Sequence, residues 1–165
     1  RSRLRNMVLS LPSLETDQWL LGANQDGSVV TWGGRDSGGD SSGVKDQLKG
    51  VQKIYANVCA FAAILSDESV VTWGDRNYGG DSSEVKDQLK GVQQVHANVR
   101  AFAAILADGS VVTWGNPDCG GDSSGVKDQL KGVQQVHATD GAFAAILADG
   151  SVVTWGGRDS GGDSS

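Results

Sequence analysis

Residues 101–115 have the sequence Ala-Phe-Ala-Ala-Ile-Leu-Ala-Asp-Gly-Ser-Val-Val-Thr-Trp-Gly. Two short apolar runs flank an Asp-Gly pair, which is a strong turn signal. A buried helix is the alternative for the first run, but six residues stopped by Asp-Gly are short for one. We therefore expect two antiparallel strands. Because a type I′ turn needs positive φ at both central residues and glycine adopts it freely, Asp108-Gly109 predicts a type I′ hairpin.

The first of these strands is apolar on both faces. Phe102, Ala104 and Leu106 point to one side, and Ala103 and Ile105 point to the other. A sheet with one face in water would instead alternate apolar and polar residues. Each small sheet is therefore expected to be covered on both sides, and the alanines allow close approach of the covering layers.

The segment recurs along the chain at a constant interval. Val-Val-Thr-Trp-Gly places its tryptophan at residues 32, 73, 114 and 155, a period of 41 residues. Residues 33–73 and 74–114 differ at 10 positions, and 74–114 and 115–155 differ at 8, so one supersecondary unit has been copied. The expected units are a degenerate N-terminal repeat at 1–32, repeats at 33–73, 74–114 and 115–155, and the start of a further repeat at 156–165. We expect the chain to be a fragment of a longer array.

Within one repeat, residues 92–97 predict a further strand ahead of the hairpin. Between repeats, residues 81–91 predict a helix of one to two turns. Ser82 or Ser83 is the expected cap, Val85 and Leu89 share a face, and Gly91 suits the residue after the helix end. The predicted fold is all-β: a partial β-propeller of 41-residue antiparallel three-stranded blades with short helical connectors. Where one copy has Asp67-Glu68 in place of Asp-Gly, a different turn is expected.

The pattern Val-x-x-Val-x-Ala, a loop, an apolar strand and Asp-Gly-Ser-Val-Val-Thr-Trp-Gly resembles the repeat of the regulator of chromosome condensation (RCC) family. The compact spacing is similar to that of the bacterial β-lactamase inhibitor propeller. The resemblance covers residues 20–165 and implies a seven-bladed propeller, of which this chain holds fewer blades. It implies a noncatalytic protein-interaction scaffold, within a larger regulatory or ubiquitin-ligase-type protein. The alternative is a guanine-nucleotide exchange factor acting on a small GTPase.

Two departures weigh against the exchange factor. Gly-Gly-Asp-Ser-Ser follows the tryptophan strand where the family usually has Gly-Gln-Leu-Gly. The family's Gly-x-x-His before the apolar strand is replaced by 98–100 (Asn-Val-Arg) or 139–141 (Thr-Asp-Gly). Exchange activity therefore cannot be transferred residue by residue.

The copies differ mainly in two loops, one after the first strand and one after the tryptophan strand. In an up-down-up meander both loops fall at the same end of the blade, opposite the Asp-Gly hairpins. Constant strands with variable loops at one end indicate either an interaction surface on a rigid frame or neutral drift at exposed positions. The candidate partner-binding residues in these loops are Arg35, Arg76, Tyr78, Arg100, Asp118, Asp140 and Arg158.

Composition limits the range of partners. A net charge of −6 opposes attraction to nucleic acids and to anionic lipid headgroups, and no apolar stretch is long enough to span a membrane. We expect a protein partner, no nucleic acid and no membrane, with self-association through open blade edges as a further prospect. Cys59 and Cys119 occupy different repeat positions, which indicates free thiols. An intracellular location, cytoplasmic or nuclear, is expected.

We expect no catalytic residue, cofactor or metal. Asp-Ser-Gly-Gly at 36–39 and 159–162 is similar to the nucleophile segment of trypsin-like proteases, but the only histidines, His96 and His137, occupy one strand position of the repeat. The same segments fit a phosphodegron-like pattern, a short motif that matches often by chance. One aspartate per Gly-Gly-Asp-Ser-Ser loop is too few for calcium. Phosphate-binding and dinucleotide-binding glycine patterns are absent.

Overall fold

The computed structural model describes residues 8–9, 20–23 and 28–163. This part of the chain forms four antiparallel three-stranded sheets, each with its strands in chain order. The strands are β1 (Val8–Leu9), β2 (Leu20–Ala23), β3 (Val29–Trp32), β4 (Val51–Ala56), β5 (Ala60–Leu65), β6 (Val70–Gly74), β7 (Val92–Ala97), β8 (Ala101–Leu106), β9 (Val111–Gly115), β10 (Val133–Ala138), β11 (Ala142–Leu147) and β12 (Val152–Gly156). The predicted all-β fold of repeated three-stranded blades is confirmed.

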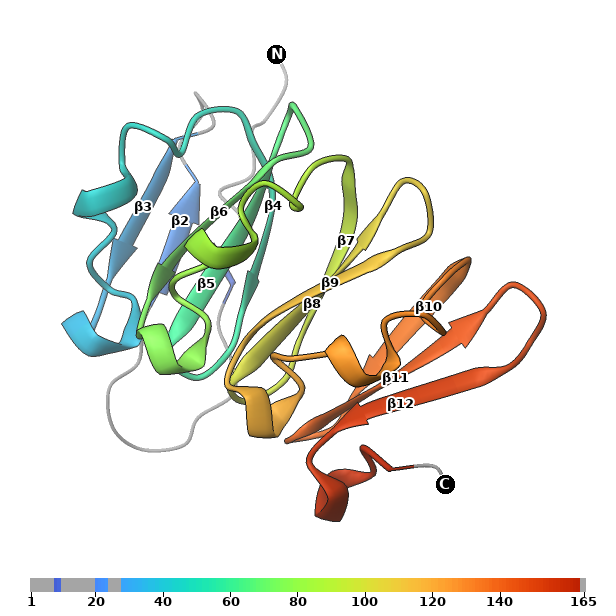
Figure 1. Cartoon of the computed structure of the whole chain (residues 1–165). Coiled ribbons are helices and arrows are strands. Elements are labelled where there is room, and N and C mark those ends of the chain that lie inside the picture. The colour runs from blue at the N-terminus through green and yellow to red at the C-terminus, as the bar shows by residue number, and fades with distance from the viewer. Residues whose placement is uncertain (1–7, 10–19, 24–27, 164–165) are drawn as a thin grey trace.

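We name the sheets blade 1 (β1–β3), blade 2 (β4–β6), blade 3 (β7–β9) and blade 4 (β10–β12). They follow one another as a fan of separate sheets (Figure 1), and the first strand of blade 3 lies beside the first strands of blades 2 and 4. Much of the predicted degenerate repeat at 1–32 lies outside the described residues. The connectors carry short 3-10 helices: η1 (Arg35–Ser37), η2 (Ser42–Val44), η3 (Arg76–Tyr78), η4 (Ser83–Val85), η5 (Pro117–Cys119), η6 (Ser124–Val126) and η7 (Arg158–Ser160).

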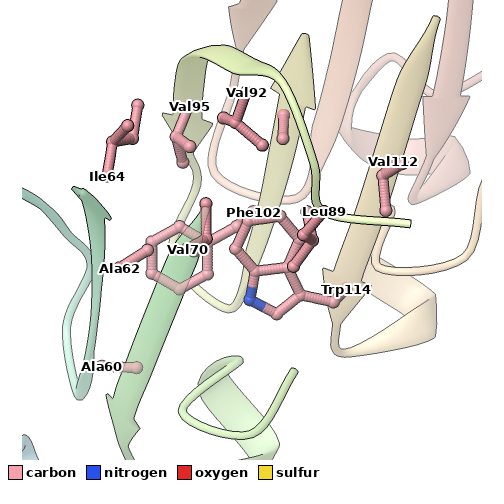
Figure 2. Packing of buried hydrophobic residues seen from close by; sticks show 11 residues of the cluster. Ala60, Ala62, Ile64, Val70, Leu89, Val92, Val95, Phe102, Val112 and Trp114 are labelled. Carbon is pink, nitrogen blue, oxygen red and sulfur yellow. The ribbon is translucent and has the colours of Figure 1, made fainter. Parts of the chain in front are cut away.

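Successive blades pack face to face, as the two apolar faces of each strand predict. Phe102 and Trp114 of blade 3 pack against Ala62 and Val70 of blade 2 (Figure 2). Equivalent residues meet between blades 3 and 4 and between blades 1 and 2. Blades 2, 3 and 4 each have a leading face, which carries phenylalanine and tryptophan toward the preceding blade. The trailing faces of blades 2 and 3 carry alanine, isoleucine and valine toward the following blade.

A tryptophan–glycine contact joins each blade to the connector before it. The indole N–H of Trp114 donates to the carbonyl oxygen of Gly79 at 3.1 Å, although the two residues are 35 positions apart. Phe102 stacks on Trp114 with ring centroids 5.3 Å apart and lies against Gly79. Gly79 has φ +88, and a Cβ atom there would lie 2.7 Å from the phenylalanine ring. This blade dock therefore requires glycine both for backbone conformation and for space.

The dock recurs at the other boundaries. Trp73 donates to Gly38 at 3.2 Å, and Trp155 donates to Gly120 at 3.1 Å. Their stacked phenylalanines lie 5.1 and 5.5 Å from the tryptophan rings. The period of 41 residues thus repeats a tertiary contact as well as a strand pattern.

The connector prediction is partly wrong. The segment 81–91 forms the 3-10 helix η4 followed by a turn, in place of a helix of one to two turns. Neither serine caps it through its side chain: Asp81 Oδ1 accepts the Ser83 N–H at 2.9 Å, and the Ser82 hydroxyl pairs with that of Thr72 at 3.0 Å. The apolar face is confirmed, because Leu89 is buried against blade 3 with Val85 beside it.

The hairpin prediction is wrong in turn type. Gly109 has φ +78, but Asp108 does not have the positive φ that a type I′ turn requires. The Gly109 N–H donates to Leu106 O and the Leu106 N–H to Ser110 O, the pattern of a longer loop closed by a left-handed residue. The Asp108 side chain accepts the N–H and the hydroxyl of Ser110, which stabilises this turn. The expected different turn at Asp67-Glu68 is also wrong, because Glu68 adopts the same turn with φ +64.

Glu68→Gly is expected to stabilise the chain. A side chain at positive φ costs roughly 1–2 kcal/mol, which glycine avoids. We expect urea unfolding followed by circular dichroism to show a free energy of unfolding higher by about 1 kcal/mol. Glu68→Ala is the control, since alanine keeps the strain. An equal gain from both substitutions would assign the effect to loss of the carboxylate.

Gly79→Ala is expected to weaken the blade dock. The substitution combines backbone strain with overpacking against Phe102, so the free energy of unfolding should fall by roughly 2–4 kcal/mol. Gly150→Ala is the matched control: Gly150 has φ +85, but no atom lies within 4 Å of the place its new methyl group would take, so only the strain of about 1 kcal/mol remains. Equal losses in urea unfolding would mean that Gly79 is required for its backbone angle alone.

Candidate functional site

The loops that vary between repeats lie together at one end of the blades. We call this region the variable-loop end; it comprises residues 57–59, 98–100 and 139–141 after the first strands, and 34–37, 75–78, 116–119 and 157–160 after the tryptophan strands. Asn57 Nδ2 donates to Tyr78 O at 2.7 Å, and Asn98 Nδ2 donates to Cys119 O at 2.6 Å. Figure 1 shows η1, η3, η5 and η7 along this end, with the β5–β6, β8–β9 and β11–β12 hairpins at the opposite end.

A buried asparagine holds the loops after β4 and β7 in place. Asn98 is only 6% exposed, and its Oδ1 accepts the N–H groups of Arg100 and Ala101 at 3.0 and 2.7 Å. Asn57 makes the same contacts in blade 2. In blade 4 Thr139 takes this position, and its hydroxyl donates to Ser160 O at 2.8 Å. The loop backbones are therefore fixed by internal hydrogen bonds, while the exposed side chains are free to differ.

Two of the candidate residues meet across a blade boundary. The guanidinium carbon of Arg100, in blade 3, lies 5.3 Å from the ring centroid of Tyr78, at the end of η3. This is the distance of a cation–π contact, which leaves the remaining guanidinium edge available to a carboxylate. Arg100 is exposed and Tyr78 is half-buried, so the pair forms one preorganised contact patch.

The corresponding positions at the other two boundaries carry different pairs. Ser37 lies beside Cys59, and Cys119 lies beside Gly141. Burial, and secondarily the nearby carboxylates of Asp75 and Asp36, raise the pKa of the Cys59 thiol. A thiol that stays protonated is a poor nucleophile, so the position favours packing over covalent chemistry.

The remaining candidate residues are distributed along the variable-loop end. Arg35, Arg76 and Arg158 are exposed on η1, η3 and η7, and their Nε atoms lie 3.2, 3.5 and 2.8 Å from aspartate carboxylates of the same connectors. Such exposed ion pairs add little stability but orient the guanidinium groups. Asp118 is exposed on η5, and Asp140 O accepts the Val99 N–H at 3.3 Å, which joins the loops of blades 3 and 4.

A groove beside blade 3 has no signal in the sequence. It has a volume of about 520 Å³ and lies between the connector after β6, the strand β9 and the connector after β9, with Arg76, Glu84, Trp114 and Lys127 among its lining residues. The groove exists because a connector packs on the blade that follows it. The sequence of a single repeat does not show which blade its connector contacts.

The histidines lie away from the variable-loop end, on the first strands β7 and β10. His96 and His137 each lie 3.4 Å from the amide oxygen of a glutamine two residues earlier. Burial, and to a lesser extent the charge of His137, lower the pKa of His96. Among the described residues no group of three or more His, Cys, Asp or Glu side chains is arranged to hold a metal ion. No helix in this part of the chain is long and apolar enough to cross a membrane.

Comparison with solved structures identifies propellers of known proteins as similar in fold. The yeast RCC1 protein Prp20, in its complex with Kap60, superposes with a TM-score of 0.58 at 17% identity, over 85% of this chain and 42% of that one. Human WBSCR16 gives a TM-score of 0.53 at 18% identity, over 94% and 49%. The ectodomain of the Arabidopsis thaliana receptor kinase ACR4 gives 0.53 at 20% identity, over 90% and 53%.

These similarities establish the propeller-type fold. The chain spans about half the length of the structures that it matches, or somewhat less. No family profile matches the sequence, and no curated protein matches it. The assignment of the propeller-type fold therefore rests on structural similarity and not on sequence similarity.

The lowered pKa of His96 predicts a dependence of stability on pH. The unfolded chain takes up this proton near pH 6.5, while the folded chain resists it, so stability is lost as the pH falls below about 6.5. Urea unfolding between about pH 7 and pH 5 should show this loss, and His96→Gln should remove part of it. Tyr55→Phe, at the equivalent position of blade 2, should leave the pH dependence unchanged. Equal slopes for wild type and His96→Gln would contradict the assignment.

Proposed function

We propose that the chain is a noncatalytic protein-interaction scaffold of RCC-type repeats that binds a protein partner through the variable-loop end. The observation that carries the proposal is the position of the differences between copies: side chains vary most in loops that meet at one end, while the docks and the second and third strands of blades 2 to 4 repeat. Rigid frames with variable loops are a common basis of recognition.

The frame supports binding because it is ordered before a partner arrives. The hydrogen bonds of Asn98 and the blade docks fix the loop backbones, so little conformational entropy is lost when a partner surface contacts these loops. The Tyr78–Arg100 pair supplies the residue types that dominate the energetics of protein interfaces. Val58, which is 54% exposed, adds an apolar side chain to the variable-loop end.

Charge varies from boundary to boundary in the same region. The blade 3 side of the boundary with blade 2 carries Arg100, whereas the next boundary carries Asp118 and Asp140. A partner with an acidic or carbonyl-rich segment opposite Arg100 and a basic segment opposite Asp118 matches this order. We further propose that the array belongs to a larger regulatory or ubiquitin-ligase-type protein, whose other parts would act on what the propeller binds.

An exchange factor for a small GTPase is the second candidate. Its support is the structural similarity to Prp20p, which has been characterised for binding to Gsp1p and histones. The loop after each tryptophan strand has Gly-Gly-Asp-Ser-Ser where the RCC family usually has Gly-Gln-Leu-Gly. A nucleotide-release assay with purified chain and GTPases separates the two functions, because only the exchange factor accelerates release.

Tyr78→Ala and Arg100→Ala are expected to weaken partner binding without unfolding the chain. Each removes one half of the cation–π patch, and a central contact of this kind changes the dissociation constant by roughly 10-fold or more. Partners captured from cells that express the protein would be quantified on wild-type and variant baits. Their affinities would then be measured with purified proteins.

Glu68→Ala, at the opposite end of the blades, is the control bait. Partners bound equally by the control and lost from both loop variants support the proposal. Partners retained by both loop variants would place the binding surface elsewhere on the propeller.

A further inference from the structure

The groove beside blade 3, which we call the edge groove, runs along the outermost strand of that blade. It has a volume of about 520 Å³, and its floor is β9, the last strand of its sheet, which pairs with β8 on one side only. Residues of the connector after β6 form one wall, and residues of the connector after β9 form the other. Blade 3 packs between blades 2 and 4, so the groove belongs to an internal blade with both of its connectors in place.

The outer edge of β9 carries backbone groups that have no partner. In an antiparallel pair, alternate residues bond to the neighbouring strand, and the residues between them direct N–H and C=O groups away from it. The Leu106 N–H donates to Ser110 O, which makes the even-numbered residues of β9 the ones bonded to β8. Val111 and Thr113 therefore direct their backbone groups outward, and within the described part of the chain no hydrogen bond reaches these groups.

These unpaired groups lie in a sheltered position. Val111 and Thr113 both line the edge groove and are each only 7% exposed. A hydrogen bond formed there is stronger than one formed at an open strand edge, because the surroundings screen it less. A segment that supplies alternating donors and acceptors beside β9 would satisfy both residues.

The connector after β9 lacks an ion pair that the other connectors have. Arginine occupies positions 35, 76 and 158, and each arginine pairs with the aspartate five residues later, at 3.2, 3.5 and 2.8 Å. The equivalent residue here is Pro117, and among the described residues no ion pair forms at Asp122. Hydrogen bonds from the Ser124 N–H and hydroxyl lower the pKa of Asp122, so its carboxylate is ionised at neutral pH.

The opposite wall adds a negative charge that the neighbouring connectors lack. Glu84 lines the edge groove, whereas the equivalent residue of the connectors before and after it is glycine. Arg76 and Asp81 also line the groove, but they pair with each other. Apart from that pair, the lining carries two carboxylates, those of Glu84 and Asp122, against the single ammonium group of Lys127. The groove therefore favours a basic side chain over an acidic one.

We propose that the edge groove binds an extended peptide segment of a protein partner, which adds as a fourth strand beside β9 and carries a basic side chain. The peptide backbone bonds to Val111 and Thr113, and the basic side chain lies toward Asp122. In strand addition of this kind, main-chain hydrogen bonds supply affinity and side chains at alternate positions supply specificity. The same carboxylates oppose a nucleic acid in this groove.

This site is separate from the one proposed at the variable-loop end. Neither Tyr78 nor Arg100 lines the edge groove, and Arg76 alone among the candidate partner-binding residues does so. Tyr78→Ala and Arg100→Ala should therefore leave peptide binding at the edge groove unchanged. Either site can fail its test without the other.

Short, dye-labelled peptides of alternating valine and threonine test the site, with arginine, glutamate or alanine placed at each position in turn. Fluorescence anisotropy with the whole chain measures their dissociation constants. The tightest arginine peptide should bind roughly 5-fold more tightly than its alanine counterpart, and the glutamate counterpart should bind more weakly than both. Methylation of the peptide nitrogens at one set of alternate residues should abolish binding, and methylation at the other set should retain it, because only one set bonds to β9.

Pro117→Arg and Asp122→Asn test the charge. Arginine stands at the equivalent position of the other three connectors, so the fold accepts it, and it should pair with Asp122 and weaken binding of the arginine peptide by roughly 5-fold. Asp122→Asn should weaken it by a similar factor, while asparagine keeps an acceptor for the Ser124 N–H. Asp118→Asn is the matched control, because Asp118 is an exposed aspartate of the same connector that does not line the groove. Circular dichroism melts confirm that each variant is folded.

Weaker binding of the arginine peptide by Pro117→Arg and Asp122→Asn, with wild-type binding by Asp118→Asn, supports the proposal. Absence of binding by every peptide at millimolar concentration overturns it. Equal affinity for the arginine and glutamate peptides, or two methylation patterns that act alike, also overturns it.

Discussion

The fold depends on one contact, the hydrogen bond from a tryptophan indole to a glycine carbonyl in the preceding connector. The three docks with donor–acceptor distances of 3.1–3.2 Å connect residues 35 positions apart, and each places a phenylalanine over the left-handed glycine. A buried indole N–H without a partner would cost more than the bond gains, so the dock fixes the register of blade on blade. Apolar stacking alone would allow the blades to slide.

The docks and the side-chain hydrogen bonds of Asn57, Asn98 and Thr139 hold the loop backbones, so the same loop conformation carries different side chains at its tip. At the three blade boundaries the facing pairs are Ser37 and Cys59, Tyr78 and Arg100, and Cys119 and Gly141. The same backbone accepts a serine beside a cysteine, a cation–π pair and a cysteine beside a glycine. This tolerance is the physical link between a repeated frame and a surface whose chemistry changes along the array.

Repetition also gives each blade two unlike faces that fit one another. Alanines at the blade centre, such as Ala62 and Ala103, are fully buried and let the sheets approach, while the phenylalanine and tryptophan of the next blade fill the remaining space. The contact between blades therefore depends on sheet faces, whereas the residues that differ most between copies lie in the loops at one end of the blades.

The sequence alone determined the period, the three strands of each blade and the face-to-face packing, because these follow from alternation and glycine placement within short segments. It also placed the variable loops at one end. The hairpin type and the connector were wrong, since Asp108 and Asp81 stabilise other turns through local side-chain bonds. Only the tertiary structure decided which glycine receives each indole, that Tyr78 meets Arg100, and where the groove lies. These contacts join different repeats, and their geometry depends on how one blade is set against the next.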